Sequence, residues 1–447
     1  MYQTIEFKTP SVLFGMDTIQ KIGKEATRLG GHRVLIVTGP RVQAAGLIEK
    51  ALASLKAETL DVEVIVEERD TPEPATSVVE EVADVARKGG FDVIVGIGGG
   101  SILDVAKMAS ALLTNPGQTR DYFGKEKVLH RGKPTIIVPT TSGTGAEVTK
   151  HAIFLDREAN VKKAVASTNL LPDVAIIDPM LAVSCPPRVT AAAGIDAFFH
   201  AVEPFLSRMA NPITDALALK AVSIITRWLA PAVADGENLG ARYQMALGSV
   251  TAGFVLNNSG TSLVHAMAYP VGGEYHTPHG ITLTVLALAC FDAIKPAKQE
   301  RLVQIAEAMG EPVAGLAHRE GADRALAAIR HLMKSVDLPV CLEEAGITDR
   351  SRIPAWAAEA HKEQRLLSRS ARILSVEDIA KIYRNYGFTT QIITASIRDT
   401  LHVTRAALCG AHIATMPMAT LKKMYDHPLT DMGLEAFLAD WRKLQGG

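Results

Sequence analysis

Apolar positions change their spacing along the chain. In the N-terminal part, short runs of β-branched residues alternate with stretches such as Gly46–Ala57 and Val78–Lys88, where apolar residues recur every three or four positions. The continuous β-branched runs are typical of strands buried on both faces, and the recurrence every three or four positions is typical of helices. A parallel α/β domain is therefore predicted. The predicted strands are Val34–Thr38, Val62–Val66, Val93–Ile97, Thr135–Val138 and Val174–Ile177.

From about Thr190 onward the pattern is almost wholly helical. Alanine- and leucine-rich segments keep a helical period and carry almost no strand signal, which indicates a second, helical domain. Two prolines that follow Cys185 interrupt regular structure and favour a boundary there. The predicted helices are Arg188–Leu206, Asp215–Ala234, Ala241–Leu256 and Gln299–Gly310.

Strand-like runs return near the C-terminus. They occupy Thr389–Thr394 and Ala411–Thr415, and a closing amphipathic helix is predicted over Leu434–Trp441. We therefore expect three parts: an α/β domain over residues 1–187, an all-α domain over residues 188–387, and a short appended α/β tail over residues 388–447.

Composition narrows the classes of function. The chain has 47 Lys and Arg and 48 Asp and Glu, a formal net charge of −1, which gives no strong field to attract nucleic acid or anionic lipid. The four cysteines lie far apart, which fits a reducing cytoplasm better than a disulfide framework. The N-terminus lacks the pattern of an export signal, and the longest apolar run, Ile281–Ile294, is short for a bilayer. We expect a cytoplasmic protein with no nucleic-acid or membrane partner.

A glycine-rich turn follows one predicted strand directly and opens a helix. Glycines let the backbone approach a ligand closely, and a helix N-terminus offers unpaired N–H groups to a pyrophosphate. The alternative is a tight connection without a ligand. The residues that we assign to a cofactor site here are Gly98, Gly99, Gly100, Ser101 and Asp104.

A second loop, from Pro139 to Glu147, also follows a predicted strand and combines hydroxyls with glycines. Such loops suit phosphate and ribose contacts, although an ordinary Ser/Thr turn capped by Glu147 would have the same composition. Its proposed cofactor contacts are Thr140, Thr141, Gly143 and Thr144.

Two later segments carry side chains that bind metals. Asp196 and His200 stand four positions apart in an apolar helical stretch, hence on one face, where a metal or a buried Asp–His hydrogen bond would explain them. His265, His276 and His279 follow within a short segment. One oxygen and three nitrogen ligands suit Fe²⁺, Zn²⁺, Ni²⁺ or Co²⁺ with a position open for substrate.

These residues together resemble the iron-containing (group III) alcohol dehydrogenase family over about residues 9–386. The motifs that carry the resemblance are Gly98-Gly-Gly-Ser101-x-x-Asp104, Pro139-Thr-Thr-x-Gly-Thr-Gly-x-Glu147, Leu171-Pro172 with Asp178-Pro179, Gly194-x-Asp196-x-x-x-His200-x-x-Glu203, and Pro278-His279-Gly280.

The resemblance implies a Rossmann-like cofactor domain, a helical metal domain and an active site between them. It implies that Asp196, His200, His265 and His279 are the metal ligands and that Lys162 lies near the cofactor. The implied reaction moves a hydride between a small primary or secondary alcohol, or its aldehyde or ketone, and NAD or NADP, while the ion lowers the pKa of the alcohol.

Two positions depart from the family pattern near the chemistry. Many members carry a possible proton-relay histidine four residues after the third ligand, and this chain has Tyr269, so Tyr269 or His276 is the candidate instead. Members that use NAD often carry an aspartate just after the first strand, where this chain has Gly39 and Arg41. Because Arg41 could pair with a 2′-phosphate, NADP is as plausible as NAD.

The tail resembles the end of a small bacterial transaldolase or fructose-6-phosphate aldolase. The Schiff-base lysine of such aldolases belongs to an earlier strand that this chain lacks, so aldolase activity is not expected, although Ser396 and Arg398 resemble a phosphate-contacting pair. The unpaired edges of a partial barrel need cover, which favours an assembly role and a homo-oligomer.

Two other functions compete with the dehydrogenase. One is a lyase of the dehydroquinate synthase type, for which a glutamate and two histidines would be expected in place of Asp196 and three histidines. The other is an assembly protein that recruits partners through its tail and would not need intact cofactor loops. Neither the alcohol nor the metal follows from the sequence.

Overall fold

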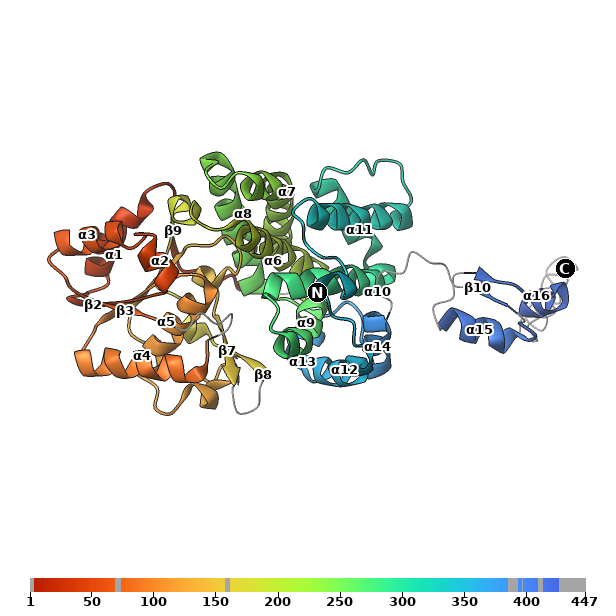
Figure 1. Cartoon of the computed structure of the whole chain (residues 1–447), viewed down its shortest axis with the longest axis horizontal. Helices are drawn as coiled ribbons and strands as arrows, with labels where there is room; N and C mark the ends of the chain where they lie inside the picture. The colour runs from red at the N-terminus through yellow and green to blue at the C-terminus, as the bar shows by residue number, and fades with distance from the viewer. Residues whose placement is uncertain are drawn as a thin grey trace, which may run out of the picture. The chain divides into compact units, whose positions relative to one another are not determined.

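The computed structural model describes residues 4–68, 74–156, 161–384, 393–395, 397–408 and 413–425. The chain divides into two compact units, Met1–Arg384 and Asn385–Gly447, which are described separately (Figure 1). The predicted closing helix over Leu434–Trp441 and the predicted phosphate contact Ser396 lie outside the described residues.

A six-stranded parallel sheet organises the N-terminal half of the first unit. Alternate residues of strand β2 (Arg33–Thr38) face opposite sides of the sheet. Leu35 and Val37 pack with helices α4 and α5, whereas Val34 and Ile36 pack with α1 and α3. Burial on both faces explains the nearly continuous apolar runs in the sequence. In sheet order the strands are β1 (Ser11–Phe14), β9 (Val174–Ile177), β6 (Thr135–Pro139), β4 (Val93–Gly98), β2 (Arg33–Thr38) and β3 (Asp61–Val66). The helices are α1 (Ile22–Arg28), α2 (Pro40–Ala44), α3 (Glu49–Ala57), α4 (Thr76–Gly89) and α5 (Gly100–Leu112).

A smaller three-stranded sheet stands beside it. Strands β7 (His151–Asp156) and β8 (Val161–Ala166) pair antiparallel, and β5 (Gly124–Lys125) adds to β8. This sheet matters for the site because β7 follows the second predicted cofactor loop directly.

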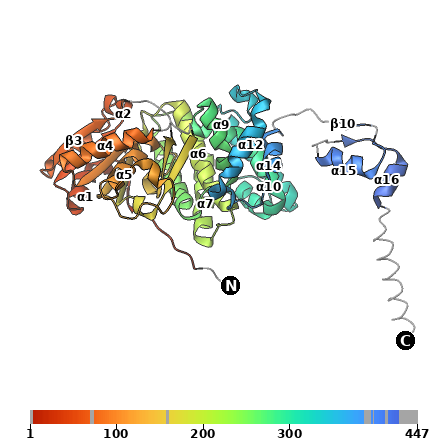
Figure 2. The ribbon, with the colours of Figure 1, turned by 90° about the horizontal axis from the view of Figure 1, so that it is seen from below.

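Helices make up the rest of the first unit, as predicted (Figure 2). The expected helix Gln299–Gly310 is the end of a longer one, α10, whose backbone breaks at Lys298, two residues after Pro296. The helices are α6 (Pro187–Leu206), α7 (Pro212–Ala234), α8 (Leu239–Ser259), α9 (Leu263–Tyr275), α10 (His279–Ala308), α11 (His318–Lys334), α12 (Ile353–Lys362), α13 (Gln364–Leu367) and α14 (Val376–Arg384). The architecture is therefore a Rossmann-like α/β half joined to an all-α half.

Two of these helices, α7 and α10, are long and apolar enough to cross a bilayer by length and composition. Core helices of globular proteins share both properties, and 61% of the apolar window of α10 is buried. Their apolar character is accordingly weak evidence for a membrane span.

The second unit contains a small parallel βαβ arrangement. Strand β10 (Ile393–Thr394) pairs with β11 (Ile413–Ala414), with α15 (Thr400–Leu408) between them and α16 (Met418–Tyr425) after them. Both strands fall inside the predicted tail strands, and the hydroxyl of Thr420 donates to the carbonyl of Arg398 at 3.3 Å.

Candidate active site

The glycine-rich turn sits at the carboxyl end of β4, where α5 begins. An added Cβ at Gly98 would come within 2.8 Å of Ile102, and one at Gly100 would come within 2.7 Å of Thr144, so both positions need glycine for packing. A Cβ at Gly99 would meet no atom within 4 Å and would project into open space. The turn therefore leaves a cradle at the N-terminus of α5 of the kind that accepts a phosphate.

A cleft of about 580 Å³ opens at this edge of the sheet. Carboxyl ends of parallel strands meet at one edge, and ligands of open α/β sheets bind there. Sequence reasoning missed Glu67, although it is the first charged residue after β3 and reaches the same edge. The polar and glycine residues that line the cleft include Gly39, Arg41, Glu67, Gly99, Ser101, Thr140 and Thr141.

A buried ion pair joins the two predicted cofactor loops. Asp104 and Lys107 lie one turn apart on α5, with Oδ1 and Nζ 2.9 Å from one another. The ammonium of Lys107 also donates to the carbonyls of Ala146 and Thr149 at 3.0 and 3.4 Å, and Asp104 accepts from the backbone N–H of Ile153 at 2.9 Å. The carboxylate of Asp104, a predicted cofactor contact, holds these protein groups, and the residue also lines the neighbouring cavity.

The second loop packs directly on helix α6. A Cβ at Gly143 would lie 2.6 Å from the Cβ of Ala193, so only glycine allows this approach. The carbonyl of Gly143 lies 3.3 Å from Nδ1 of His200 and can accept a hydrogen bond from it. Gly143 thus positions an imidazole of the helical half, whereas Thr144 lines the adjacent cavity.

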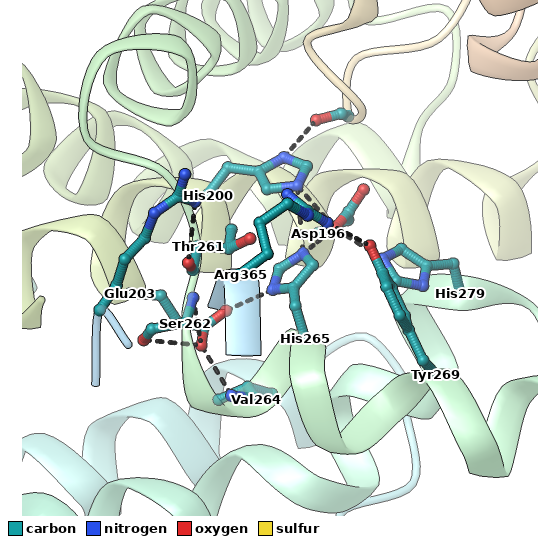
Figure 3. Close-up of polar contacts among 12 residues, drawn as sticks. Asp196, His200, Glu203, Thr261, Ser262, Val264, His265, Tyr269, His279 and Arg365 are labelled. Atoms are coloured by element: carbon teal, nitrogen blue, oxygen red, sulfur yellow. Dashed lines mark hydrogen bonds and ion pairs between the residues drawn. The ribbon is translucent and has the colours of Figure 1, made fainter. Parts of the chain in front are cut away.

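Four side chains predicted as metal ligands converge in one place (Figure 3). Asp196 and His200 come from α6, His265 from α9, and His279 is the first residue of α10. From Oδ1 of Asp196, the Nε2 atoms of His200, His265 and His279 lie 3.3, 3.7 and 3.8 Å away. Ligand atoms of Asp196, His265 and His279 all fall within 4.8 Å of one another. The spacing along α6 explains the first pair, and the fold brings in the other two.

The oxygen at the middle of this cluster lacks a hydrogen-bond donor. Oδ1 of Asp196 is buried and unsatisfied within the described part of the chain, which is costly unless a cation completes the site. Burial alone would raise the pKa of Asp196, but the imidazoles, His200 first, lower it to about 2. Burial lowers the pKa of His279 to about 3. An ionised carboxylate and a neutral imidazole are the forms that bind metals, and Asp196 and His279 are held in these forms. One carboxylate oxygen and three imidazole nitrogens together fit a divalent ion.

Glu203 contacts the cluster on the side of His265 that faces away from Asp196. Its carboxylate is almost fully buried, one turn beyond His200 on α6, and contacts Nδ1 of His265. It also accepts from the backbone N–H of Val264 at 2.7 Å and from the hydroxyl of Ser262 at 3.2 Å (Figure 3). Burial alone would lower the pKa of His265, but the negative charge of Glu203 and the hydrogen bonds of this imidazole with Asp196 and Glu203 raise it to about 9. A carboxylate on the far nitrogen orients a ligating imidazole, a role that the position of Glu203 on the ligand face of α6 could have suggested.

A cavity of about 170 Å³ lies over this cluster. Lys162 and Tyr269, both predicted, line it, whereas His276 is exposed at the end of α9 and is not among its lining residues. Sequence reasoning missed three titratable lining residues, of which one follows the second cofactor loop by four positions and two stand far from every motif in the chain. These are His151, Arg365 and Arg369.

Comparison with known proteins identifies both halves of the first unit. Residues 9–179 match the family "Iron-containing alcohol dehydrogenase", and residues 190–387 match "Fe-containing alcohol dehydrogenase family, C-terminal". Residues 350–446 match "Transaldolase/Fructose-6-phosphate aldolase", a match that begins earlier than the expected tail and overlaps the helical half.

Individual relatives cover most of the chain. It is 38% identical to long-chain-alcohol dehydrogenase 1 of Geobacillus thermodenitrificans over 83% of this chain and 93% of the relative. It is 35% identical to the NAD-dependent methanol dehydrogenase of Bacillus methanolicus over 85% of this chain and 98% of that enzyme. A crystal structure of 1,3-propanediol oxidoreductase superposes with a TM-score of 0.82 at 35% identity, covering 86% of this chain and 99% of the other.

Proposed function

This chain belongs to the iron-containing alcohol dehydrogenase family. We propose that it transfers a hydride between a small primary or secondary alcohol and NAD or NADP, beside the four residues Asp196, His200, His265 and His279, which we call the Asp196 cluster. The observation that carries the proposal is the unsatisfied buried oxygen of Asp196 among three imidazole nitrogens, next to a cavity that both cofactor loops reach. Named relatives act on alcohols, and one of them depends on NAD.

Asp196, His200, His265 and His279 would hold the ion. Ligand type suits Fe²⁺, Zn²⁺, Ni²⁺ or Co²⁺, and the family to which the chain belongs favours Fe²⁺ among them. A divalent ion in such a site acts as a Lewis acid on the alcohol or carbonyl oxygen. The protein contributes the fixed ligand positions, with Glu203 orienting His265, and a cavity beside the ligands that can admit the substrate.

The sheet edge would hold the cofactor. The N-terminus of α5, together with Gly99, Ser101, Thr140 and Thr141, suits the phosphates and ribose. Gly100, Thr144 and Lys162 line the cavity on the side of the cofactor loops and suit the nicotinamide. Arg41 favours a 2′-phosphate and Glu67 disfavours one, so the choice between NADP and NAD is left to experiment.

A proton must leave or enter as the hydride moves. Tyr269 is the better candidate to carry it because its side chain lines the cavity and burial raises its pKa, which keeps the phenol protonated. The exposed position of His276 makes it the poorer one. We further propose a homo-oligomer, since the edges of the tail strands need cover, and a cytoplasmic location, which the four widely spaced cysteines favour.

A dehydroquinate-synthase-like lyase and a pure assembly protein explain fewer observations. The first would need a different ligand set, and the second would need neither the cofactor cradle nor the Asp196 cluster.

The test is a substrate panel with protein reconstituted with Fe²⁺ under anaerobic conditions. Oxidation of NADH and of NADPH is followed with ethanal, propanal and butanal. We expect turnover that a chelator abolishes and that added metal restores. Full activity of chelated Asp196→Ala protein would overturn metal-dependent catalysis.

A further inference from the structure

Two guanidinium groups line the cavity over the metal cluster. Arg365 belongs to the short helix α13, and Arg369 follows four residues later. Nη2 of Arg365 lies 3.4 Å from the hydroxyl of Tyr269, a contact marked in Figure 3. Nη1 of Arg369 lies 3.4 Å from the carbonyl of Thr261. Both contacts are long, so neither satisfies the charge of its arginine.

Within the described residues this pair has no direct carboxylate partner, and Glu363, two positions before Arg365, interacts with Arg365 electrostatically without forming an ion pair or lining the cavity. Among the described residues, no Asp or Glu oxygen forms an ion pair with Arg365 or Arg369, whereas Arg352 pairs with Glu274 at 2.8 Å. The two carboxylates that line the cavity are already committed, Asp196 to the metal cluster and Asp104 to Lys107. The cavity therefore has a cationic end.

The two arginines also repel one another. Burial, and then the charge of Arg365, lowers the pKa of Arg369 to about 10, which still leaves it charged at neutral pH. Burial together with the same two charges lowers the pKa of His151, which lines the same cavity, well below its ordinary value. A bound anion would relieve this repulsion, and a guanidinium presents its N–H groups in a fork that matches a carboxylate.

We propose that the preferred substrate is a short aldehyde or alcohol that carries an oxyanion group, such as a carboxylate, at the end opposite to the reacting carbon. The proposal rests on the proposed function, because the reacting carbon must lie at the Asp196 cluster. Tyr269 stands one helical turn after His265 on α9 and contacts Arg365, so its side chain links the metal cluster to the cationic end. A cavity of about 170 Å³ suits a small acyclic acid.

The experiment compares two aldehydes of the same chain length with metal-loaded enzyme and reduced cofactor. Succinic semialdehyde carries the carboxylate and butanal does not. We expect kcat/KM to favour succinic semialdehyde, and Arg365→Met or Arg369→Met to lower the ratio of the two kcat/KM values by about 10- to 100-fold, the usual weight of a charge-assisted contact. Arg365→Lys should recover part of the ratio because it keeps the charge.

The matched control is Arg372→Met, three residues beyond Arg369. Arg372 is exposed, donates to the carbonyl of Ala293 at 2.6 Å and does not line the cavity, so the ratio should stay unchanged. A ratio that favours butanal, or one that neither cavity variant alters, overturns the proposal.

Calorimetric binding of succinate, which cannot be reduced here, separates this inference from the proposed function. The wild-type protein should bind succinate about 10-fold or more tightly than Arg365→Met does. Equal affinities overturn the anion site whatever the turnover. Arginine-dependent binding of succinate without reduction of either aldehyde supports the anion site and contradicts hydride transfer to small aldehydes.

Discussion

The Asp196 cluster and the glycine-rich edge of the sheet hold their proposed ligands by different means. The cluster presents side-chain atoms from three helices, each fixed by packing or by a partner such as Glu203. The edge presents backbone, and its shape depends on where a Cβ is missing, as at Gly98, Gly99 and Gly100. Substitutions in the cluster should therefore reduce metal binding and turnover, whereas substitutions at the edge of the sheet should change cofactor binding, cofactor selectivity or the stability of the fold.

The largest effect is expected from His265→Ala. It removes a proposed ligand and leaves Glu203 without its imidazole, so bound metal should be lost and kcat/KM should fall by about 1,000-fold or more. Metal content by plasma emission and turnover are measured together. His331→Ala, on the exposed face of α11, is the control. Retained metal and turnover in His265→Ala would contradict the assigned ligand set.

The next largest effect is expected from Lys107→Met. This variant tests whether the cofactor loops at the edge of the sheet depend on a side-chain ion pair as well as on glycine backbone. The variant leaves Asp104 buried without its cation, and loss of one partner of a buried pair costs about 3–5 kcal/mol of stability. Urea unfolding should detect it. The double variant Asp104→Asn, Lys107→Met should recover part of the loss, and an unchanged midpoint in the single variant would mean that the loops do not depend on this pair.

A smaller effect is expected from Glu203→Gln, which keeps the shape of the side chain and removes its charge. Loss of such a supporting carboxylate weakens metal binding by about 10- to 100-fold. Competition with a fluorescent chelator measures the affinity, with Glu300→Gln, an exposed position on α10, as the control. Unchanged affinity would restrict Glu203 to a packing role.

The sequence predicts the metal ligands and the glycine-rich turn, but it predicts few of the contacts that support them. The spacing of four positions is enough to place Asp196 and His200 on one face of a helix. A glycine-rich turn between a buried strand and a helix is likewise enough to predict a phosphate-binding cradle, without knowledge of the sheet order. The supporting contacts depend on folding: Glu203 meets a histidine 62 residues later, and Arg365 meets a tyrosine 96 residues earlier. Local periodicity can place Glu203 on the ligand face of α6 and Lys107 one turn after Asp104, but it holds no information on contacts between distant segments, so the partner of Glu203 and the two cavity arginines become visible only in the structure.

The smallest effect is expected at the sheet edge, from Gly39→Asp. Gly39 lines the cofactor cleft, and a Cβ there would meet its nearest neighbour, Ile102, at 3.7 Å, so the new side chain fits without displacing the backbone. Its carboxylate would accept from ribose hydroxyls and repel a 2′-phosphate, shifting the ratio of kcat/KM for NADPH to that for NADH toward NADH by about 10-fold, roughly 1.4 kcal/mol. Gly39→Asn has the same shape without the charge and is the matched control. If the ratio in Gly39→Asp equals that in Gly39→Asn, charge at this position does not read the ribose, and the choice of cofactor must depend on other groups of the cleft, with Arg41 and Glu67 the next positions to exchange.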